Sequence, residues 1–354
     1  MSNCTPSGNA NLQPRVDASC TACGAADERV IASAHELEVQ RRYLKRFHRR
    51  RLEVRGGDAL EERAEFTQDY ATNVVACREC GLLYRDPRPG DDAIAKAYAC
   101  DTYGGDRLDA LFDSQLELFR PKARELAQRL SGARPGVVEI GSFVGGFLAA
   151  CAELGWDAVG IDPGHEVADF CKARGLTVHR ASAADCPIPA GSVDCVAIWN
   201  TFDQLPDPHP TLRAVQGWLR PGGLLVLRVP DGRCFSACMG KLRRWPPPFR
   251  SVLLAAMAWN NLLSFPYLHG YSPGTLDRLL GLYGFTRVHT RGDVLTRLSD
   301  EQTRPWARRE EQLLKAAWMV GVKMSRECAP VAPWFDAYYA APRQGHETIE
   351  EDCA

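Results

Sequence analysis

Two pairs of cysteines have the types and spacing of a metal site. Cys20 and Cys23 form one CxxC pair, Cys77 and Cys80 form the other, and a glycine follows each pair. Four thiolates in this arrangement surround one zinc ion tetrahedrally and leave no open position for water. We therefore predict a structural Zn²⁺ bound by these four cysteines. A redox dithiol pair and reduced free thiols are the alternatives, because the interval between the pairs exceeds the usual spacing of such sites.

Two carboxylates stand where neighbouring apolar runs end. Val137–Ile140 and Ala158–Ile161 have the composition of short strands, and a glycine-rich turn and a helical pattern separate them. Such a unit begins a doubly wound parallel sheet, which binds ligands beyond the carboxyl ends of its strands. Asp162, after the second run, can accept hydrogen bonds from both hydroxyls of a ribose. Glu139, at the end of the first, would repel a pyrophosphate and favour a ligand that carries an ammonium and a sulfonium.

The turn between these runs departs from the dinucleotide-binding spacing GxGxxG. Its glycines are Gly141, Gly145 and Gly146. With Glu139 before them, they resemble the first motif, (E/D)xGxGxG, of the class I S-adenosylmethionine-dependent methyltransferases, and the resemblance extends over 136–231. The Pro-Gly-Gly turn before Leu224–Val229 belongs to the same pattern. Phe143 departs from it, because it occupies the middle glycine position, where a Cβ limits both φ and the approach of a ligand.

The resemblance implies a fold, a cofactor and a set of binding residues. The fold is a doubly wound, seven-stranded, Rossmann-like α/β sheet, and the cofactor is S-adenosyl-L-methionine. Asp185 stands where the family has an acid or amide for the adenine amino group, and Tyr103 where an aromatic ring folds over the cofactor. A surface acid at Asp185 and a packing role for Tyr103 are the alternatives. The residues that we expect to bind the cofactor are Glu139, Gly141, Phe143, Gly145, Asp162, Asp185, Asn200 and Tyr103.

Asp203 and Gln204 resemble the family's fourth motif, in which some relatives hold a metal with an acid and a histidine. Because Gln204 replaces the histidine, we expect no catalytic metal. A general base is needed if the methyl acceptor is a hydroxyl or an acidic carbon. His269 is the first candidate, because histidine titrates near neutral pH, and Asp203 and Tyr271 follow it. A hydrogen-bonding role for His269 in a loop is the alternative.

A second resemblance covers residues 20–89. The run CRECGLLYRDPRP around the second cysteine pair is similar to the N-terminal zinc ribbon of some bacterial class I methyltransferases. Between the two pairs, eight Lys and Arg residues lie in the segment 39–55, where Val39, Tyr43 and Phe47 recur at helical spacing. This basic helix either contacts an anionic partner or is a solvated surface balanced by the acids that follow it, and the sequence leaves its role open.

Composition shifts divide the chain. We expect a disordered tail at 1–18, a zinc-ribbon module with the basic insertion at 19–90, linking helices at 91–131, a Rossmann-like methyltransferase domain at 132–298, and a C-terminal helix and tail at 299–354. Val294–Leu298 is the expected reversed strand that completes the sheet. The long, aromatic-rich segment 232–271 is expected to form a helical lid over the acceptor pocket, with a helix of the core as the alternative.

Length and composition indicate the cellular compartment in which we expect the chain. The chain has 354 residues, of which 45% are hydrophobic, and a net charge of −1. Most of its 14 cysteines are isolated among apolar residues, which indicates a reducing, cytoplasmic compartment. The polar residues 1–17 predict no secretory leader, and no run is long and apolar enough to span a bilayer.

These observations favour an enzyme that methylates a small molecule or a glycan or natural-product intermediate. A nucleic-acid or protein methyltransferase that uses the ribbon and the basic helix for recognition is one alternative, although no NPPY-type motif follows Asn200. A non-catalytic nucleotide-binding protein in which Phe143 closes the site is another. The near-neutral charge argues against nucleic acid as a partner, whereas peripheral contact with a membrane or a lipid carrier stays open. Neither the acceptor atom nor the oligomeric state follows from the sequence.

Overall fold

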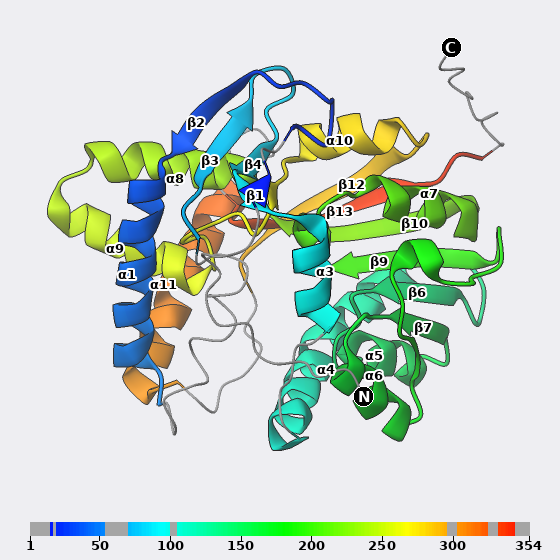
Figure 1. The fold of residues 1–354 in the computed structure, drawn as a ribbon. Coiled ribbons are helices and arrows are strands. Elements are labelled where there is room, and N and C mark those ends of the chain that lie inside the picture. The colour runs from blue at the N-terminus through cyan, green and yellow to red at the C-terminus, as the bar shows by residue number, and fades with distance from the viewer. Residues whose placement is uncertain are drawn as a thin grey trace, which may run out of the picture.

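The computed structural model describes residues 15–16, 19–53, 70–99, 105–295, 303–324 and 332–343. Figure 1 shows a large twisted sheet with helices on both faces and, beside it, a smaller sheet bordered by the helix α1 (Ala34–Arg51).

The large sheet has seven strands in the order β12-β13-β10-β9-β6-β7-β8. The strands from β8 to β10 are parallel to one another, and β13 runs antiparallel to both β10 and β12. This arrangement confirms the predicted doubly wound α/β sheet. Its strands are β6 (Gly136–Ile140), β7 (Asp157–Ile161), β8 (Thr177–His179), β9 (Val193–Trp199), β10 (Leu219–Pro230), β12 (Thr286–Asp293) and β13 (Trp334–Ala340).

Helices cover both faces of this sheet because side chains alternate along each strand. Val137 of β6 faces a cluster that contains Phe119 and Phe147, whereas the adjacent Val138 faces a cluster with Leu212 and Leu276 on the other side. The helices concerned are α4 (Gly105–Ala127), α5 (Gly146–Glu153), α6 (His165–Ala173), α7 (His209–Trp218) and α10 (Pro273–Gly281), with two short 3₁₀ turns, η2 (Ala183–Asp185) and η3 (Phe202–Gln204).

The reversed strand of the sheet is β13, and not Val294–Leu298 as we expected. Val294 and Leu295 belong to no strand, and residues 296–298 lie outside the described residues. β13 lies between β10 and β12, and it comes from the segment 299–354, which we expected to be only a helix and a tail. The short WFDAYYA run alternates too little to identify its partners from sequence, and a long excursion separates it from the strands that it joins.

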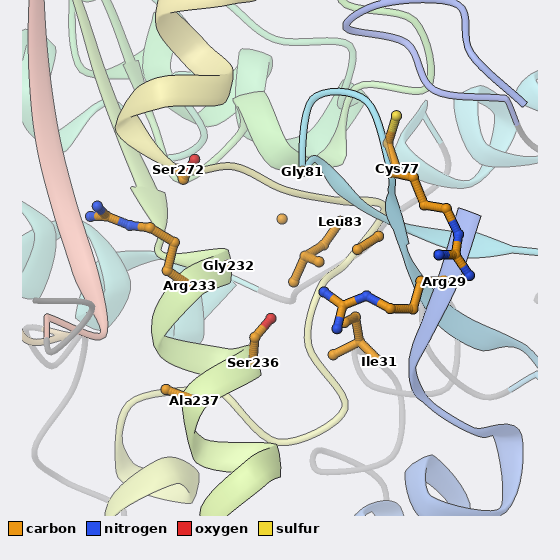
Figure 2. A pocket seen from close by; sticks show the side chains of 13 residues that line it. Arg29, Ile31, Cys77, Gly81, Leu83, Gly232, Arg233, Ser236, Ala237 and Ser272 are labelled. Carbon is orange, nitrogen blue, oxygen red and sulfur yellow. The ribbon is translucent and has the colours of Figure 1, made fainter. Parts of the chain in front are cut away.

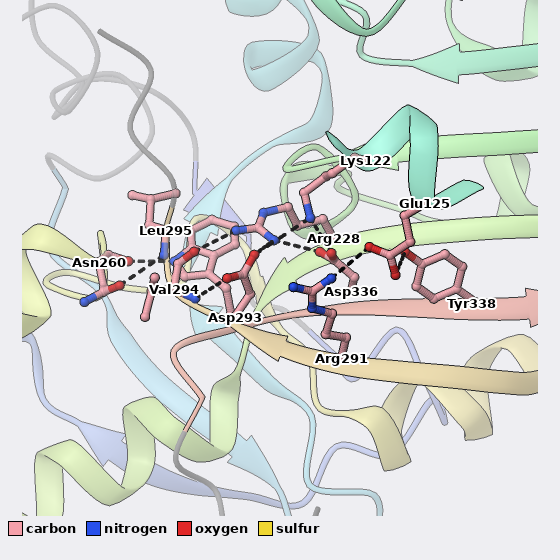
Figure 3. A network of polar contacts seen from close by, with 11 residues as sticks. Lys122, Glu125, Arg228, Asn260, Arg291, Asp293, Val294, Leu295, Asp336 and Tyr338 are labelled. Atoms are coloured by element: carbon pink, nitrogen blue, oxygen red, sulfur yellow. Dashed lines mark hydrogen bonds and ion pairs between the residues drawn. The ribbon is translucent and has the colours of Figure 1, made fainter. Parts of the chain in front are cut away.

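A buried charge network holds β13 in place. Arg228 of β10 lies opposite Asp336 of β13 and donates from Nη1 to Asp336 Oδ1 at 2.7 Å and to Asp293 Oδ2, at the end of β12, at 2.9 Å. Lys122 of α4 also pairs with Asp336 (Figure 3). Because Arg228 and Asp336 are both buried, each needs the other to offset the cost of desolvation, and this requirement fixes the register of the three strands.

The smaller sheet has the order β11-β4-β3-β2, with antiparallel pairing throughout. Its strands are β2 (Glu28–Ala32), β3 (Asn73–Cys77), β4 (Leu83–Asp86) and β11 (His269–Gly270). Because β11 closes the segment 232–271, that segment and the cysteine pairs share one sheet.

The segment 232–271 forms two helices, α8 (Gly232–Arg244) and α9 (Pro247–Trp259). Phe235 of α8 and Met257 of α9 share a buried cluster with Phe47 of α1 and with residues of the smaller sheet. These contacts favour the interpretation of 232–271 as core over its interpretation as a lid, because a segment that opens over a site does not have its inner face sealed by other elements.

The helix α1 is the one predicted in the basic insertion. It begins with a capping box formed by Ser33 and Glu36, and its last turn is basic, which suits the negative end of the helix dipole. Arg51 binds Glu310 of α11 (Pro305–Met324), with 2.6 Å between Arg51 Nε and Glu310 Oε2. Val39, which recurs at helical spacing with Tyr43 and Phe47, is exposed. The buried residues of α1 are Leu37, Gln40 and Phe47.

Two helices lie in the chain between the smaller sheet and the larger one. They are α3 (Asp91–Ala99) and α4, and Pro121 lies inside α4. Near the first of them, β5 (Arg88–Pro89) pairs with β1 (Arg15–Val16). Among the helices of the described residues, none combines the length and the apolar character that crossing a membrane requires.

Candidate cofactor site and thiolate cluster

Four sulfur atoms meet at one end of the smaller sheet. Cys77 ends β3 and Cys80 lies in the following turn, while Cys20 and Cys23 come from the turn before β2. The four atoms lie within 4.8 Å of one another, with 3.4 Å between the sulfurs of Cys20 and Cys80 and 3.5 Å between those of Cys23 and Cys77. Zinc–sulfur bonds of about 2.3 Å in a tetrahedron require sulfurs about 3.8 Å apart. The donor set and its spacing therefore fit a closed zinc site.

The turn after β6 depends on glycine. Gly141 has a φ of 75° and Gly145 one of 78°. A Cβ on Gly141 would come within 2.2 Å of the hydroxyl oxygen of Thr201, which follows β9, and the Gly141 N–H donates to Ile161 O at 2.8 Å. α5 starts directly after the turn, so its first backbone N–H groups face this edge of the sheet. The turn thus joins the carboxyl ends of β6, β7 and β9.

Glu139 is buried at the end of β6. The residue is 2% exposed, and its Oε2 has no hydrogen-bond partner within the described residues. Burial raises the pKa of Glu139 well above its ordinary value, and the neighbouring Asp162 raises it further. A buried carboxyl in these surroundings lacks a counter-charge, which a cationic group of a ligand would supply.

Asp162 follows β7 and holds the glycine turn. One carboxylate oxygen accepts from the backbone N–H of Phe143 at 2.8 Å, and the other accepts from that of Gly164 at 2.9 Å. Each oxygen of a carboxylate has two lone pairs, so both retain capacity for a ribose hydroxyl. The structure therefore brings Glu139, Asp162 and the turn together, as the sequence predicts.

Phe143 takes the backbone conformation of the glycine that it replaces. Its φ is 47°, a region that costs a residue with a Cβ about 1–2 kcal/mol. Its side chain packs against a small apolar cluster of α4 and α6 residues that includes Leu108, Leu111 and Val167. These contacts and the hydrogen bond to Asp162 offset the cost of the conformation.

The other predicted cofactor residues have different surroundings. Asn200 directly follows β9 with a φ of 56°, and its Oδ1 is buried without a partner among the described residues. Asp185 is exposed and accepts from the Ser182 hydroxyl at 2.6 Å, as a surface acid does. Tyr103 lies outside the described residues.

Tyr98 is an aromatic residue at this edge that the sequence motifs did not single out. The Tyr98 hydroxyl donates to Gln204 Oε1 at 2.7 Å, and the Gln204 amide donates to Asn200 O at 2.6 Å. The Tyr98 carbonyl oxygen lies 3.8 Å from the point where a Cβ on Gly164 would be. Tyr98 therefore bridges the carboxyl ends of β7 and β9. Its position in the last turn of α3, just before the glycine-containing break, was the available signal.

The three candidate bases meet between the smaller sheet and the end of β9. The ring centroids of His269 and Tyr271 are 5.8 Å apart, and the Leu268 N–H donates to Asp203 O at 3.2 Å. His269, Tyr271 and Asp203 are buried, and within the described part of the chain no other residue donates a hydrogen bond to either carboxylate oxygen of Asp203. Burial raises the pKa of Asp203 to about 8 and lowers that of His269 to about 3. At neutral pH, therefore, Asp203 is mostly protonated and His269 is neutral.

A cavity of about 680 Å³ lies between the smaller sheet and α8 (Figure 2). It is lined by Arg29, Arg78 and Arg233 and by the hydroxyls of Ser236 and Ser272, and none of its lining residues is acidic. Arg78 and Arg233 pair with neighbouring aspartates, whereas Arg29 has no acidic partner in the part of the chain that the structure describes. In Figure 2 the Arg29 guanidinium extends from β2 toward Ser236.

The cavity and the three candidate bases lie on opposite sides of β11. Gly270 lines the cavity, and side chains alternate along a strand, so the neighbouring His269 and Tyr271 point the other way. No sequence pattern indicates this cavity, because its lining comes from segments that are far apart along the chain.

Known proteins are similar to the part of the chain that forms most of the large sheet. A family model described as a methyltransferase domain matches residues 112–290. An uncharacterized methyltransferase from Mycobacterium sp. (strain JLS) is 34% identical over 109 residues, which are 29% of this chain and 43% of that protein. The match therefore spans less than half of the relative's length.

Solved structures with similarity to this chain include two methyltransferases. A SAM-dependent methyltransferase from Archaeoglobus fulgidus has a TM-score of 0.42 and 16% identity, with 64% of this chain and 94% of that chain covered. A methyltransferase of Haloferax volcanii, described as putative and solved in complex with the Trm112 activator, has a TM-score of 0.43 and 17% identity, with coverages of 68% and 99%.

Proposed function

The chain belongs to the methyltransferase-domain family, and from this membership we propose that it transfers a methyl group from S-adenosyl-L-methionine to a small-molecule or glycan-type acceptor. The observation that carries the proposal is the buried Glu139 carboxyl, whose Oε2 has no partner within the described residues. A ligand that brings a positive charge to the end of β6 would satisfy this group, and the amino group of S-adenosyl-L-methionine is such a charge.

Different residues at the carboxyl edge of the sheet would bind different parts of this cofactor. Asp162 would accept hydrogen bonds from the ribose hydroxyls, and the turn from Gly141 to Gly145 leaves room for the ligand beside the backbone. The buried Oδ1 of Asn200 offers a further acceptor at the end of β9. The bound cofactor supplies an electrophilic methyl group, and the protein contributes chiefly the orientation of the acceptor toward it.

Asp203 is the stronger candidate for the general base. A pKa of about 8 matches a base that works near neutral pH, whereas a histidine with a pKa of about 3 is a weak proton acceptor. His269 and Tyr271 then exclude water from Asp203, since all three are buried. If the acceptor is an amine that is already neutral, no base is required.

The arginine-lined cavity suggests the chemical class of the acceptor. Its volume of about 680 Å³ suits a small molecule, and it lies at the carboxyl end of β10. Because β11 separates it from the candidate bases, it would hold a part of the acceptor other than the reacting atom. Arg29 in particular would bind an anionic group of the acceptor at a distance from the reacting atom. An Arg29→Ala variant should then raise the KM for the acceptor more than it lowers kcat.

The four thiolates would hold a structural zinc ion. The fitting donor set and sulfur spacing support this proposal, and a closed shell of four thiolates leaves no position for chemistry at the metal. The ion would fix β2, β3 and β4 at the end where Cys20 and Cys77 lie, and so hold the sheet that bounds the cavity.

Product analysis tests the proposed function. The protein is incubated with S-adenosyl-L-methionine that carries a deuterated methyl group and with a panel of phosphorylated, carboxylated and neutral sugars and polyketides. Mass spectrometry should find S-adenosylhomocysteine together with a labelled anionic product. If no member of the panel is labelled and the protein does not bind S-adenosylhomocysteine, the proposal fails, and the non-catalytic alternative with Phe143 closing the site takes its place.

A further inference from the structure

The hairpin formed by α8 and α9 exposes apolar side chains at its tip. Trp245 is 40% exposed, Phe249 is 61% exposed and Val252 is 56% exposed. The Trp245 and Phe249 rings lie with their centroids 6.3 Å apart, so they form one patch, with three prolines between them. We call residues 241–252 the hairpin tip. Figure 1 shows α8 and α9 on the side of the molecule away from β6, β7 and α5.

The hairpin tip is also basic. Lys241, Arg243, Arg244 and Arg250 flank the aromatic residues, and the Lys241 ammonium lies 5.5 Å from the centroid of the Trp245 ring. Arg243 binds Glu36 of α1, whereas Arg244 and Arg250 have no acidic partner among the described residues. The sequence between Asp231 and Asp277 contains no aspartate or glutamate. No negative charge of the hairpin itself therefore weakens the attraction of an anionic surface.

The inner face of the hairpin is fixed by packing, so the exposed tip is held rigidly. Phe235 and Met239 of α8 and Leu253 and Met257 of α9 are buried in the cluster that also contains Phe47. Trp245 and Phe249 are not part of this cluster, and both are exposed. A rigid support for exposed Trp and Phe side chains favours a role in binding over accidental exposure.

We infer that the hairpin tip docks on the surface of an anionic lipid bilayer. Trp245 and Phe249 would enter the region between headgroups and acyl chains, where amphipathic aromatic rings are most stable. Arg244, Arg250 and Lys241 would lie against the anionic headgroups. The pairing of exposed aromatic residues with basic residues, in a stretch without acidic residues, favours a bilayer over a folded partner, which would need a complementary groove. This inference concerns a different surface from the proposed cofactor site and does not depend on catalysis.

Flotation with lipid vesicles tests the inference. The full chain is mixed with vesicles of phosphatidylcholine alone and with vesicles that contain about one third phosphatidylglycerol. We expect binding to the anionic vesicles that is at least tenfold stronger than binding to the neutral ones and that weakens as salt is added. The tryptophan emission of the chain should shift to shorter wavelength on binding, and a Trp245→Phe variant, which keeps the other seven tryptophans, should not show this shift.

Variants separate the two parts of the tip. The double variant Trp245→Ala/Phe249→Ala should lose at least tenfold in affinity for anionic vesicles, and Arg244→Glu/Arg250→Glu should lose the preference for them. Leu282→Ala, which removes a side chain of a residue that is 66% exposed after α10, is the matched control and should bind as the unaltered chain does. Circular dichroism shows whether each variant is folded. Equal binding to neutral and anionic vesicles, no binding to either, or binding to soluble polyglutamate in place of vesicles would overturn the inference.

Discussion

Replacing the buried Asp203 by asparagine should stabilise the protein increasingly as the pH rises. The folded-state pKa of Asp203 is about 8, compared with 3.8 for an unperturbed aspartate. Between these two pKa values the native state holds a proton that the unfolded chain has released. The contribution of Asp203 to the free energy of unfolding is therefore fully present below pH 3.8 and is lost as the pH rises to about 8. The asparagine side chain of the variant does not titrate. The free energy of unfolding of the variant, relative to that of the unaltered chain, should therefore rise by about 1.4 kcal/mol per pH unit within this window.

Urea unfolding at pH 5 and pH 7, followed by tryptophan fluorescence, measures this effect. The difference in the free energy of unfolding between Asp203→Asn and the unaltered chain should grow by about 2.7 kcal/mol between the two pH values. A buried amide without partners has a constant cost of about 1–3 kcal/mol, which shifts both differences equally and leaves the slope unchanged.

A matched control is Asp185→Asn, because Asp185 is an exposed acid on the same edge of the sheet. It should follow the pH dependence of the unaltered chain. If the free energies of unfolding of Asp203→Asn and of the unaltered chain depend on pH in the same way, the pKa of Asp203 in the folded state is the ordinary one. That result would remove the argument for Asp203 as the base. In the active enzyme, the rate with a hydroxyl acceptor should rise with pH to about 8, and Asp203→Asn should abolish that rise.

Three other variants test the framework around the site. Asp336→Asn leaves buried Arg228 without its main counter-charge and should lower the free energy of unfolding by about 3–5 kcal/mol, measured in urea. Cys77→Ser should reduce the zinc content, measured by mass spectrometry of the metal, from one ion per chain to almost none, and native protein without zinc would contradict the assignment. Gly141→Ala places a Cβ against Thr201 at a φ of 75° and should weaken binding of S-adenosylhomocysteine by at least tenfold, whereas normal affinity would place the ligand elsewhere.

The sequence was sufficient for the features that depend on local pattern. The glycine turn, the short strands beside it and the acids at their ends follow from neighbouring residues, so the sequence alone places Glu139 and Asp162 at one edge of the sheet. The cysteine pairs were equally readable, because each CxxCG motif forms its own tight turn.

Features that depend on distant partners could not be read in the same way. The strand β13 belongs in the sheet because Asp336 neutralises Arg228, which lies more than a hundred positions earlier in the chain. The burial of α8 and α9 depends on a face of α1 that leaves Val39 outside and places Gln40 inside, which helical spacing alone does not indicate. Tyr98 reaches the end of β9 through Gln204, a contact between residues that are 106 positions apart, so no local motif marks it.

Calorimetric titration of S-adenosylhomocysteine into the unaltered chain and into Glu139→Gln tests the proposed cofactor site most directly. Burial and the neighbouring Asp162 raise the pKa of Glu139, and a cationic ligand should lower it again. Binding should therefore release protons to the buffer, and Glu139→Gln should abolish this release and weaken binding by about tenfold to a hundredfold. Glu153→Gln, at an exposed residue of α5, is the control and should bind unchanged. Equal affinity and equal proton release in the Glu139→Gln variant would mean that this carboxyl does not meet the ligand, and the proposed site would be wrong.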